Sequence, residues 1–237
     1  GLGMARELGW PDAPDALPRP VIDSHTHLDV HDRSLHGDQA PDADALLAWA
    51  EQVGVPKVVQ IGCDVESAEW SVPFARDHPN VAVGVAVHPN DAARIGVRQG
   101  RDALEAAWAR IDELARDPVV RAVGETGLDY FRTPESEGQA IQHDSFRWHI
   151  DLATELDKTL VIHDRDSHDD VVSVLRQRGG VTRSVADGAG RPAPGGNRCA
   201  VPHAETEPRT RQRDVSHAVD GPSHGRGARC RRRETVR

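Results

Sequence analysis

The chain of 237 residues is long enough for one large domain and carries a formal net charge of -9 at neutral pH. This charge excludes a protein that coats nucleic acids by general electrostatic attraction, although a metal site can still bind phosphates locally. Because the sequence has no apolar run suited to a membrane span or signal peptide and no zinc-type or disulfide pattern among its three cysteines, we expect a soluble, cytoplasmic protein.

From residue 21 to about residue 180, apolar runs typical of buried strands alternate with segments whose apolar residues recur at helical spacing. We predict strands at residues 21–25, 57–62, 81–87, 119–125 and 159–163. Helices are predicted between them at residues 42–54, 101–117 and 139–157. Regular alternation of this kind predicts a parallel sheet or barrel, preceded here by an N-terminal extension over residues 1–20.

The first predicted strand leads into the stretch VIDSHTHLDV, which places two histidines two residues apart. In an extended segment alternate side chains share a face, and here these are Asp23, His25, His27 and Asp29. Imidazole is a common metal ligand, and two imidazoles on one face of a strand end can bind a single ion. We therefore predict that His25 and His27 are metal ligands, the alternative being two histidines on a solvated loop.

The residues after each predicted strand are polar and rich in metal-ligand types. The strands are followed in turn by HTHLD, CD, HPND, ETGLDY and HDRD. A doubly wound sheet needs such residues mainly at its switch point, whereas a barrel gathers all its strand ends into one ring. The pattern therefore favours a barrel.

Two further metal ligands are predicted at the ends of the fourth and fifth strands. Glu125 ends an apolar run between Gly124 and Gly127, which let the backbone turn tightly, and its carboxylate is placed to bridge two divalent ions. His163 ends the run TLVIH in the same way and is a candidate ligand for a second ion. Solvated or half-buried structural residues are the alternative at both positions.

The remaining histidines of the first 180 residues are interpreted differently. His88 precedes a proline, where it either begins a turn or contacts a substrate phosphate rather than a metal. His143 and His149 lie on a segment with helical periodicity, and we expect both to be structural.

The composition changes abruptly after residue 180. Residues 181–237 contain no Leu, Ile, Phe, Trp, Tyr, Met or Lys, and are crowded with Arg, Gly, Ala and Pro. Without large apolar side chains a segment has nothing from which to build a core. We expect a low-complexity tail that is disordered or translated from a shifted reading frame, with no packed element.

Four motifs, in this order and at this spacing, carry a family resemblance: VIDSHTHLD, VHPND, VGETGLDYFR and LVIHDRDSHDD. Together they resemble the TatD family of metal-dependent hydrolases from about residue 19 to about residue 178. The resemblance implies an α/β fold, a TIM-like (β/α)8 barrel that is incomplete here after the fifth βα unit. It also implies a binuclear divalent-metal site, a deoxyribonuclease activity with DNA as substrate, and magnesium as the ion, with zinc or manganese as alternatives. No obligate protein partner is implied.

The resemblance also implies individual roles. His25 and His27 would hold one ion, His163 the other, and Glu125 would bridge both. Glu125, His88 and Asp129 are the expected catalytic residues, and Asp129 and Asp164 are expected to orient water or the groups that surround the ligands. The reaction would be metal-assisted hydrolysis of a phosphodiester bond.

The family pattern continues with a later histidine and a later aspartate, in His-Cys-Phe-Ser-Gly-like and Glu-Thr-Asp-like motifs that do not occur here. One ligand of each ion is therefore missing, and an inactive, truncated or frameshifted product is one alternative. Another is a related amidohydrolase acting on a different ester or amide. Many of these bridge their ions with a modified lysine on the fourth strand, but this chain has only Lys57 and Lys158. A third alternative makes the C-terminal RGARCRRRETVR a nucleic-acid-binding tail.

Overall fold

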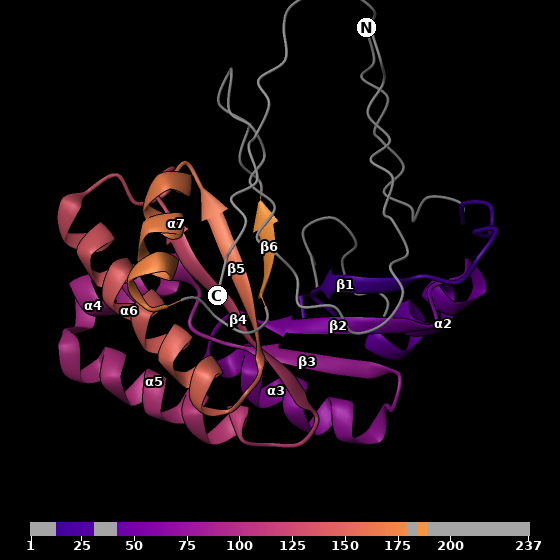
Figure 1. Cartoon of the computed structure of the whole chain (residues 1–237). Coiled ribbons are helices and arrows are strands. Elements are labelled where there is room, and N and C mark those ends of the chain that lie inside the picture. The colour runs from indigo at the N-terminus through magenta and orange to yellow at the C-terminus, as the bar shows by residue number, and fades with distance from the viewer. Residues whose placement is uncertain (1–12, 31–41, 180–183, 189–237) are drawn as a thin grey trace, which may run out of the picture. The chain divides into compact units, whose positions relative to one another are not determined.

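In the part of the chain that the structure describes, six parallel strands form one sheet in which each strand lies beside its neighbour in the sequence (Figure 1). The computed structural model describes residues 13–30, 42–179 and 184–188. The strands are β1 (Ile22–Thr26), β2 (Lys57–Gly62), β3 (Val81–Val85), β4 (Val120–Asp129), β5 (Thr159–Arg165) and β6 (Ser184–Gly188). The helices are α2 (Ala43–Gln52), α3 (Val65–Asp77), α4 (Pro89–Gln99), α5 (Arg101–Ala115), α6 (Ser136–Glu155) and α7 (His168–Gln177).

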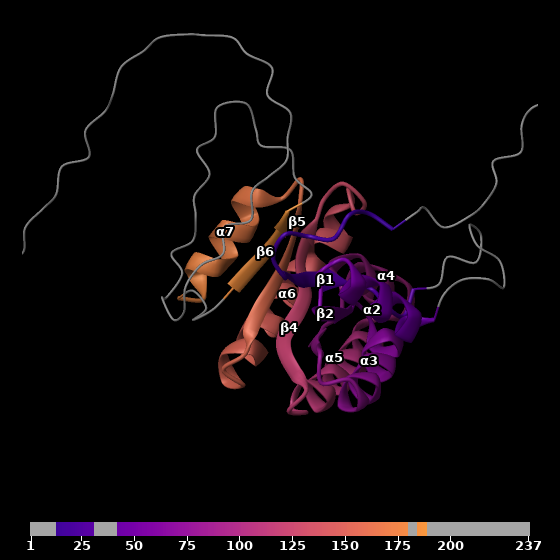
Figure 2. The ribbon, with the colours of Figure 1, turned by 90° about the vertical axis from the view of Figure 1, so that its right-hand side faces the viewer.

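The strand order β1-β2-β3-β4-β5-β6 follows the chain without reversal. A doubly wound sheet reverses its order at a switch point, whereas a (β/α)8 barrel adds each new parallel strand to the same edge. Figure 2 shows the sheet from another side, with α7 on the left of the view and α2, α3 and α4 on the right. The described residues thus form five complete βα units and a sixth strand of a barrel, as the sequence predicts.

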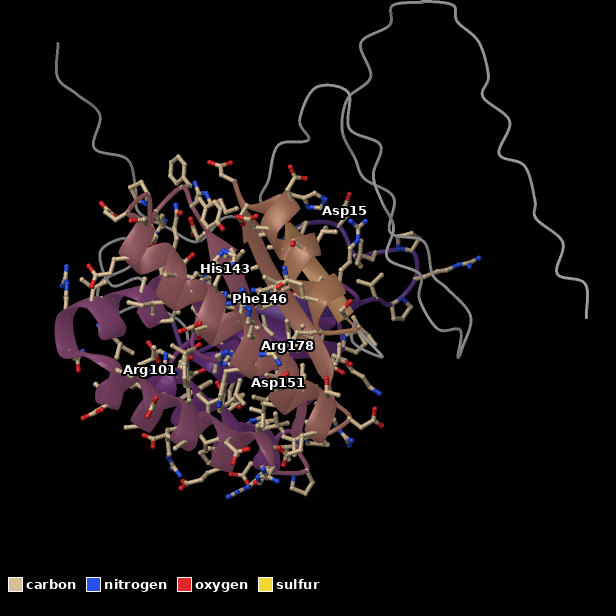
Figure 3. The ribbon with its side chains drawn as sticks, turned by 60° about the vertical axis from the view of Figure 1, so that its left-hand side comes forward. Asp15, Arg101, His143, Phe146, Asp151 and Arg178 are labelled. Atoms are coloured by element: carbon tan, nitrogen blue, oxygen red, sulfur yellow. The ribbon has the colours of Figure 1, made fainter. Side chains whose placement is uncertain are left out.

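The two faces of the sheet are packed very differently. The face toward the helices carries the main core, which includes Val83, Leu160, Leu104 and Phe146. Figure 3 labels Phe146 on α6, and its side chain is fully buried. The opposite face holds a small cluster of three buried side chains, Ile61, Ala122 and Val161, with Val59 and Cys63 beside it. Such side chains fill the interior of a (β/α)8 barrel, so this second face is the barrel's inner face.

The predicted strands and helices are all present, and the fourth strand runs further than predicted, to Asp129. Three helices of the described residues, α3, α4 and α7, are not predicted from the sequence. Pro73 lies inside α3, and a proline within a segment argues against a helix when only the sequence is known. The first turn of α3 is capped by Asp64, which accepts a hydrogen bond from the Ser67 amide. In α4 the proline after His88 opens the helix rather than a turn, since a first-turn residue needs no amide hydrogen.

The expectation that residues 181–237 contain no packed element is wrong at residues 184–188. These residues form β6, which pairs in parallel with β5 from Leu160 to Asp164. A parallel ladder is made by backbone amides and carbonyls, so the free edge of β5 can bind a strand that has no large side chains. The rest of the predicted tail, residues 181–183 and 189–237, lies outside the described residues.

The N-terminal extension is described from residue 13 onward. Its Leu17 amide donates to the Val53 carbonyl at 2.9 Å, so this part of the extension lies against the end of α2. Residues 1–12 lie outside the described part of the chain. Within the described residues, no helix has both the length and the apolar character that crossing a membrane requires.

Candidate metal centre

Polar side chains from four parallel strands meet at the carboxyl end of the sheet. His25, His27 and Glu125 offer ligand atoms that all lie within 4.8 Å of one another, and His88, Glu125 and His163 form a second group of the same kind. Glu125 belongs to both groups. The structure therefore brings together the four residues expected to hold metal, and it adds His88 to them.

A β-bulge in β1 aims the first two histidines. Asp23 pairs with Val58 and Thr26 with Gln60, so three steps on β1 match two steps on β2. Beyond the strand, Nδ1 of His27 donates to the Ile61 carbonyl at 3.0 Å. A carbonyl can only accept, so the proton of the neutral ring lies on Nδ1 and Nε2 is left with a free lone pair. His27 therefore has the tautomer that a metal ligand needs.

The expectation that Asp29 shares the face of these histidines is wrong, because β1 ends at Thr26 and its bulge breaks the alternation. Asp29 turns away and accepts hydrogen bonds from Gln60 at 2.6 Å and Ser67 at 2.5 Å. Asp23 accepts the amide of His25 at 3.0 Å. Asp23 thus holds the backbone at His25, Asp29 is bonded to side chains of β2 and α3, and both aspartates lie outside the two ligand groups.

Glu125 sits on a second bulge, in β4. Val123 pairs with Leu160 and Thr126 with Ile162, so one extra residue of β4 is accommodated at Gly124–Glu125. The flanking glycines are required by the close approach of β5. A Cβ atom at Gly124 would lie 2.4 Å from Cβ of Val161, and one at Gly127 would lie 2.0 Å from the carbonyl oxygen of His163. Both contacts are impossible for a larger residue, so the bulge depends on glycine.

The two carboxylate oxygens of Glu125 face different histidines. Oε2 lies 3.5 Å from Nε2 of His25, and Oε1 lies 2.7 Å from Nδ1 of His163. Two ligand atoms about 2.1 Å from one ion at angles of 90–109° are about 3.0 to 3.4 Å apart. The Glu125–His25 distance is close to this range. Burial raises the pKa of Glu125, but the hydrogen bond from His163 and the charges of His88, His163 and His25 outweigh it and lower that pKa overall.

His163 is held between two carboxylates. Its Nε2 lies 3.1 Å from Oδ2 of Asp129, while its Nδ1 faces Glu125. Burial lowers the pKa of His163, but its contacts with Glu125 and Asp129 outweigh burial and raise it overall. In the charged ring both nitrogens donate. A divalent ion would replace the proton on Nδ1, while Nε2–H would still donate to Asp129. A histidine that binds a metal through one nitrogen and donates to a carboxylate through the other is common in metal sites.

His88 has the opposite tautomer to His27. Its Nδ1 accepts the Asn90 amide at 3.2 Å as the N-cap of α4, so the proton of the neutral ring lies on Nε2. This Nε2 lies 3.3 Å from Nδ1 of His163 and points into the second ligand group. Burial lowers the pKa of His88 to about 4, helped by the charge of His163, so the ring is neutral near pH 7. His88 therefore presents an N–H donor to the centre.

Several other residues considered from the sequence lie elsewhere. His149 is fully buried beneath the sheet, where its Nε2 accepts the Val87 amide at 3.1 Å, and His143 contacts the Tyr130 hydroxyl at 2.7 Å. Asp164 accepts from Ser167 and His168 at the start of α7. Lys158 donates to the carbonyls of Ala115 and Asp117, before β5 begins, and Lys57 is an exposed residue at the start of β2. Both described lysines thus lie at the amino ends of strands, away from Glu125.

Three neighbours of the centre were not singled out from the sequence. Asn90 donates to Oδ2 of Asp129 at 2.9 Å, and Gln142 accepts the Asp129 amide at 2.9 Å. The Cys63 thiol lies 3.9 Å from Oε2 of Glu125, and its pKa is raised by burial and by the charge of Glu125. Asn90 and Cys63 lie in the polar motifs that follow β3 and β2, so their position at strand ends could have predicted that they lie near the centre. Gln142 lies in mid-helix, and nothing local distinguishes it.

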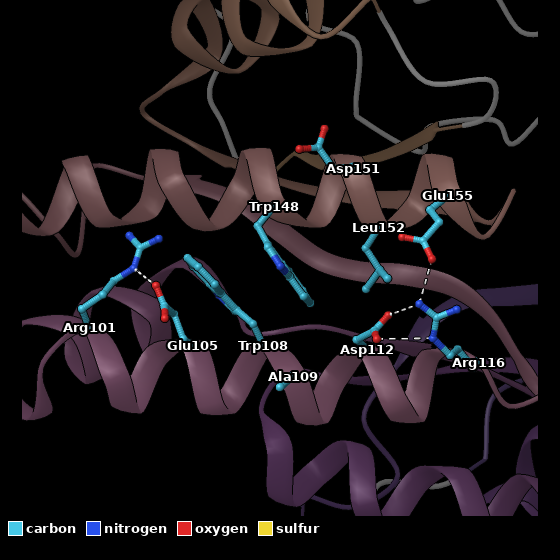
Figure 4. A pocket seen from close by; sticks show the side chains of 10 residues that line it. All are labelled: Arg101, Glu105, Trp108, Ala109, Asp112, Arg116, Trp148, Asp151, Leu152 and Glu155. Atoms are coloured by element: carbon cyan, nitrogen blue, oxygen red, sulfur yellow. Dashed lines mark hydrogen bonds and ion pairs between the residues drawn. The ribbon is translucent and has the colours of Figure 1, made fainter.

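A groove of about 510 Å³ between α5 and α6 lies apart from this centre (Figure 4). Trp108 and Trp148 stack inside it with their ring centroids 5.4 Å apart. Ion pairs such as Arg116–Glu155, at 2.8 Å, cross between the two helices. Because no ligand of the centre lines this groove, it belongs to the packing of the helices.

Comparison with known proteins places these motifs in one family. The family model described as TatD related DNase matches residues 22–186, well over half of the chain. The chain belongs to the TatD family. The family resemblance expected from the sequence is therefore confirmed, and the matched region contains every predicted metal ligand.

Among individual relatives, the uncharacterized metal-dependent hydrolase TatD of Mycobacterium tuberculosis is 39% identical over 166 residues, 67% of this chain and 57% of the relative. A TatD protein of Edwardsiella piscicida named 3'-5' ssDNA/RNA exonuclease is 28% identical, over 63% of this chain and 54% of its own length. The crystal structure of the Escherichia coli TatD homologue YJJV superposes with a TM-score of 0.54 at 23% identity, covering 66% of this chain and 55% of that chain. The chain thus spans little more than half of these TatD relatives, and the structural likeness confirms the fold.

Proposed function

We propose that this chain hydrolyses phosphodiester bonds in single-stranded nucleic acid, using two divalent ions bridged by Glu125. The observation that carries the proposal is the position of Glu125, whose Oε2 faces His25 and whose Oε1 faces His163. His25 and His27 would hold one ion and His163 the other. Two ions held by these residues would lower the pKa of a bound water and would stabilise the attacking and leaving oxygens.

The tautomers of the histidines support different roles within this centre. His27 leaves a lone pair on Nε2 because its Nδ1–H is donated to the Ile61 carbonyl. Nε2 of His163 contacts Asp129, so Nδ1 is the nitrogen that faces Glu125 and is available to a metal ion. His88, by contrast, has an Nε2–H, which suits a phosphate oxygen better than a metal ion. We therefore assign His27 and His163 to metal and His88 to the substrate phosphate.

The donor set bears on the choice of ion. Three imidazoles and one carboxylate surround the two proposed ions. Magnesium prefers oxygen ligands, whereas zinc and manganese are readily bound by imidazole with carboxylate. Magnesium remains the ion that the family resemblance implies, but these residues favour manganese or zinc.

Two observations support a nucleic-acid substrate. Relatives from Edwardsiella piscicida and Escherichia fergusonii are named 3'-5' ssDNA/RNA exonucleases. The centre also combines metal ligands with a neutral N–H donor on His88, which together suit the charged and uncharged oxygens of a phosphodiester. An acidic chain gains its attraction for a polyanion from the ions rather than from its net charge.

The proposal is tested by measuring metal content and hydrolysis on the same protein. The chain is stripped with EDTA, dialysed, and titrated with Mn²⁺, Zn²⁺ and Mg²⁺ by calorimetry, and the bound ions are counted by mass spectrometry. Hydrolysis of an end-labelled single-stranded oligonucleotide is followed on denaturing gels. We expect two ions per chain at saturation with at least one of the three metals, and hydrolysis that depends on that metal.

The decisive variant is Glu125→Gln, with Glu105→Gln on α5 as its control. Glu105 is an exposed partner of Arg101 and lies outside the centre. Glu125→Gln should bind both ions at least about 10- to 100-fold more weakly and lose hydrolysis, because even supporting residues of metal sites have effects of this size. Undiminished metal binding and turnover in Glu125→Gln would show that the centre is not the active site.

A further inference from the structure

Phe131 and Arg165 stack on each other at the carboxyl ends of β4 and β5. The Arg165 guanidinium carbon lies 3.9 Å from the centroid of the Phe131 ring. Phe131 is 60% exposed, although most of the large apolar side chains of the described residues are buried. Arg165 is half-buried, and it forms no ion pair with an acidic side chain among the residues that the structure describes. The pair therefore presents an aromatic ring and a guanidinium plane together at the surface.

Strand geometry places this pair beside the metal centre. Arg165 follows His163 by two residues on β5, and alternate residues of a strand point to the same face. Arg165 pairs in register with Asp129, the residue that holds the His163 ring. The Tyr130 amide donates to the Arg165 carbonyl at 3.0 Å, so the backbone of β4 stays paired with β5 up to the residue before Phe131.

The turn that carries Phe131 is fixed by the same aspartate. Oδ1 of Asp129 accepts the Arg132 amide at 2.8 Å, and its carbonyl accepts the Thr133 amide at 3.2 Å. Oδ2 of Asp129 meanwhile contacts His163. One buried side chain thus positions both a proposed metal ligand and the turn that presents Phe131, which ties the location of the ring to that of the centre.

The same turn borders a groove of about 340 Å³ between α4 and the start of α6. Arg94, Arg98 and Arg132 line it, together with Glu135 and Glu137. Arg94 is paired with Asp91 at 2.6 Å, whereas Arg98 and Arg132 have no ion pair within the described part of the chain. Basic side chains are thus available next to the exposed ring, as a track for a phosphate backbone requires.

We propose that Phe131 and Arg165 form a stacking platform for a base of single-stranded nucleic acid bound at the metal centre. The proposal rests on the substrate class of the proposed function. Every base has a flat face that stacks on an aromatic ring or a guanidinium plane, so the platform contributes affinity without reading a particular sequence. Held next to His163, it positions the strand for cleavage and favours substrates whose bases are unpaired.

The test compares two hydrolysis-resistant phosphorothioate oligonucleotides of equal length, one with bases and one in which every base is replaced by an abasic tetrahydrofuran unit. Binding of each to the full chain is measured by fluorescence anisotropy in the presence of Mn²⁺. We expect the chain to bind the oligonucleotide with bases about 5- to 150-fold more tightly, the range given by the stacking of one base. Phe131→Ala should remove this preference and leave binding of the abasic oligonucleotide unchanged, and Phe131→Trp should restore it.

Trp49→Ala serves as the matched control, because Trp49 is also an exposed aromatic residue but lies on α2. It should retain the full preference. A preference that survives in Phe131→Ala, or an equal affinity of the unmodified chain for both oligonucleotides, overturns the platform. In that case metal-dependent hydrolysis can persist, so the proposed function still stands. Failure of the chain to bind either oligonucleotide overturns the platform and the nucleic-acid substrate together.

Discussion

Oδ2 of Asp129 lies 3.1 Å from Nε2 of His163, and this contact decides which nitrogen of the ring faces Glu125. The two residues are separated by 34 positions in the sequence and come together because β4 and β5 are adjacent. The carboxylate does not belong to either ligand group, yet it orients a ligand. Residues of this kind commonly influence metal affinity nearly as strongly as the ligands themselves.

Asp129→Asn should therefore weaken metal binding at His163 about 10- to 100-fold, because a neutral amide oxygen holds the Nε2 proton less firmly than a carboxylate does. Calorimetric titration with Mn²⁺ measures the effect. Asp164→Asn is the matched control, since Asp164 follows His163 directly but accepts hydrogen bonds from Ser167 and His168 instead. Equal losses in the two variants would mean that the contact between Asp129 and His163 has no special role.

His88→Gln should leave the number of bound ions unchanged and lower the turnover of oligonucleotides about 100- to 1,000-fold, because it removes a donor aimed at the substrate phosphate. Metal content and single-turnover rates are measured on the same preparation. His143→Gln, which alters a histidine bonded to Tyr130 outside the ligand groups, should change neither quantity. Loss of one ion in His88→Gln would instead make His88 a ligand in the second group.

Gly127→Ala should destabilise the protein far more than Gly100→Ala does. Both glycines have positive φ, 146° and 91°, so both substitutions strain the backbone. Only at Gly127 would the new Cβ meet another chain segment, at 2.0 Å from the His163 carbonyl oxygen, whereas nothing lies within 4 Å at Gly100. Overpacking of this kind typically costs about 1 to 3 kcal/mol. Urea unfolding of the two variants measures the difference, and similar midpoints would contradict the close approach of β5.

His149 should make the protein less stable as the pH falls below neutrality. Complete burial lowers its pKa to about 4, from an ordinary value of about 6.5. Between these two values the unfolded chain binds a proton that the folded chain does not, so the free energy of unfolding decreases as the pH falls. From pH 7 to pH 5 this one group accounts for about 2 kcal/mol.

His149→Gln should remove that part of the pH dependence, measured by urea unfolding in EDTA at pH 7, 6 and 5. Any constant loss of stability from the substitution cancels when the slopes are compared. His78→Gln is the contrasting variant, because the backbone carbonyl of Phe74 and the carboxylate of Asp44 raise the pKa of His78 instead. An unchanged slope in His149→Gln would show that this histidine is charged or exposed in the folded protein.

Much of the fold is local in origin. The runs at residues 57–62, 81–87 and 159–163 are continuous and β-branched because both faces of these strands are buried, and that burial can be inferred without knowing the neighbours. The metal ligands at strand ends follow from the same reasoning, since parallel strands of a barrel all end at one rim. His25, Glu125 and His163 were therefore recognisable before any contact was known.

Helices α3 and α4 were not recognisable in this way. Each contains a proline, and whether a helix tolerates a proline depends on the position of that residue within the helix and on what packs against it. Strand β6 depends on the free edge of β5, which supplies backbone partners to a segment whose composition predicts none. Local pattern and composition contain no information about such an edge.

The features of the metal centre also separate into those that the sequence determines and those that the tertiary structure decides. The sequence by itself determined which side chains are available at the rim, because residue type and alternation are local properties. Only the tertiary structure decided that Asp29 turns toward Gln60, that a bulge aims Glu125 at two histidine groups, and that His27 and His88 have opposite tautomers. Each of these outcomes is set by the register between strands or by a hydrogen-bond partner, and except for the Asn90 amide at His88 those partners lie far away in the sequence. Such partners meet only when the sheet is formed.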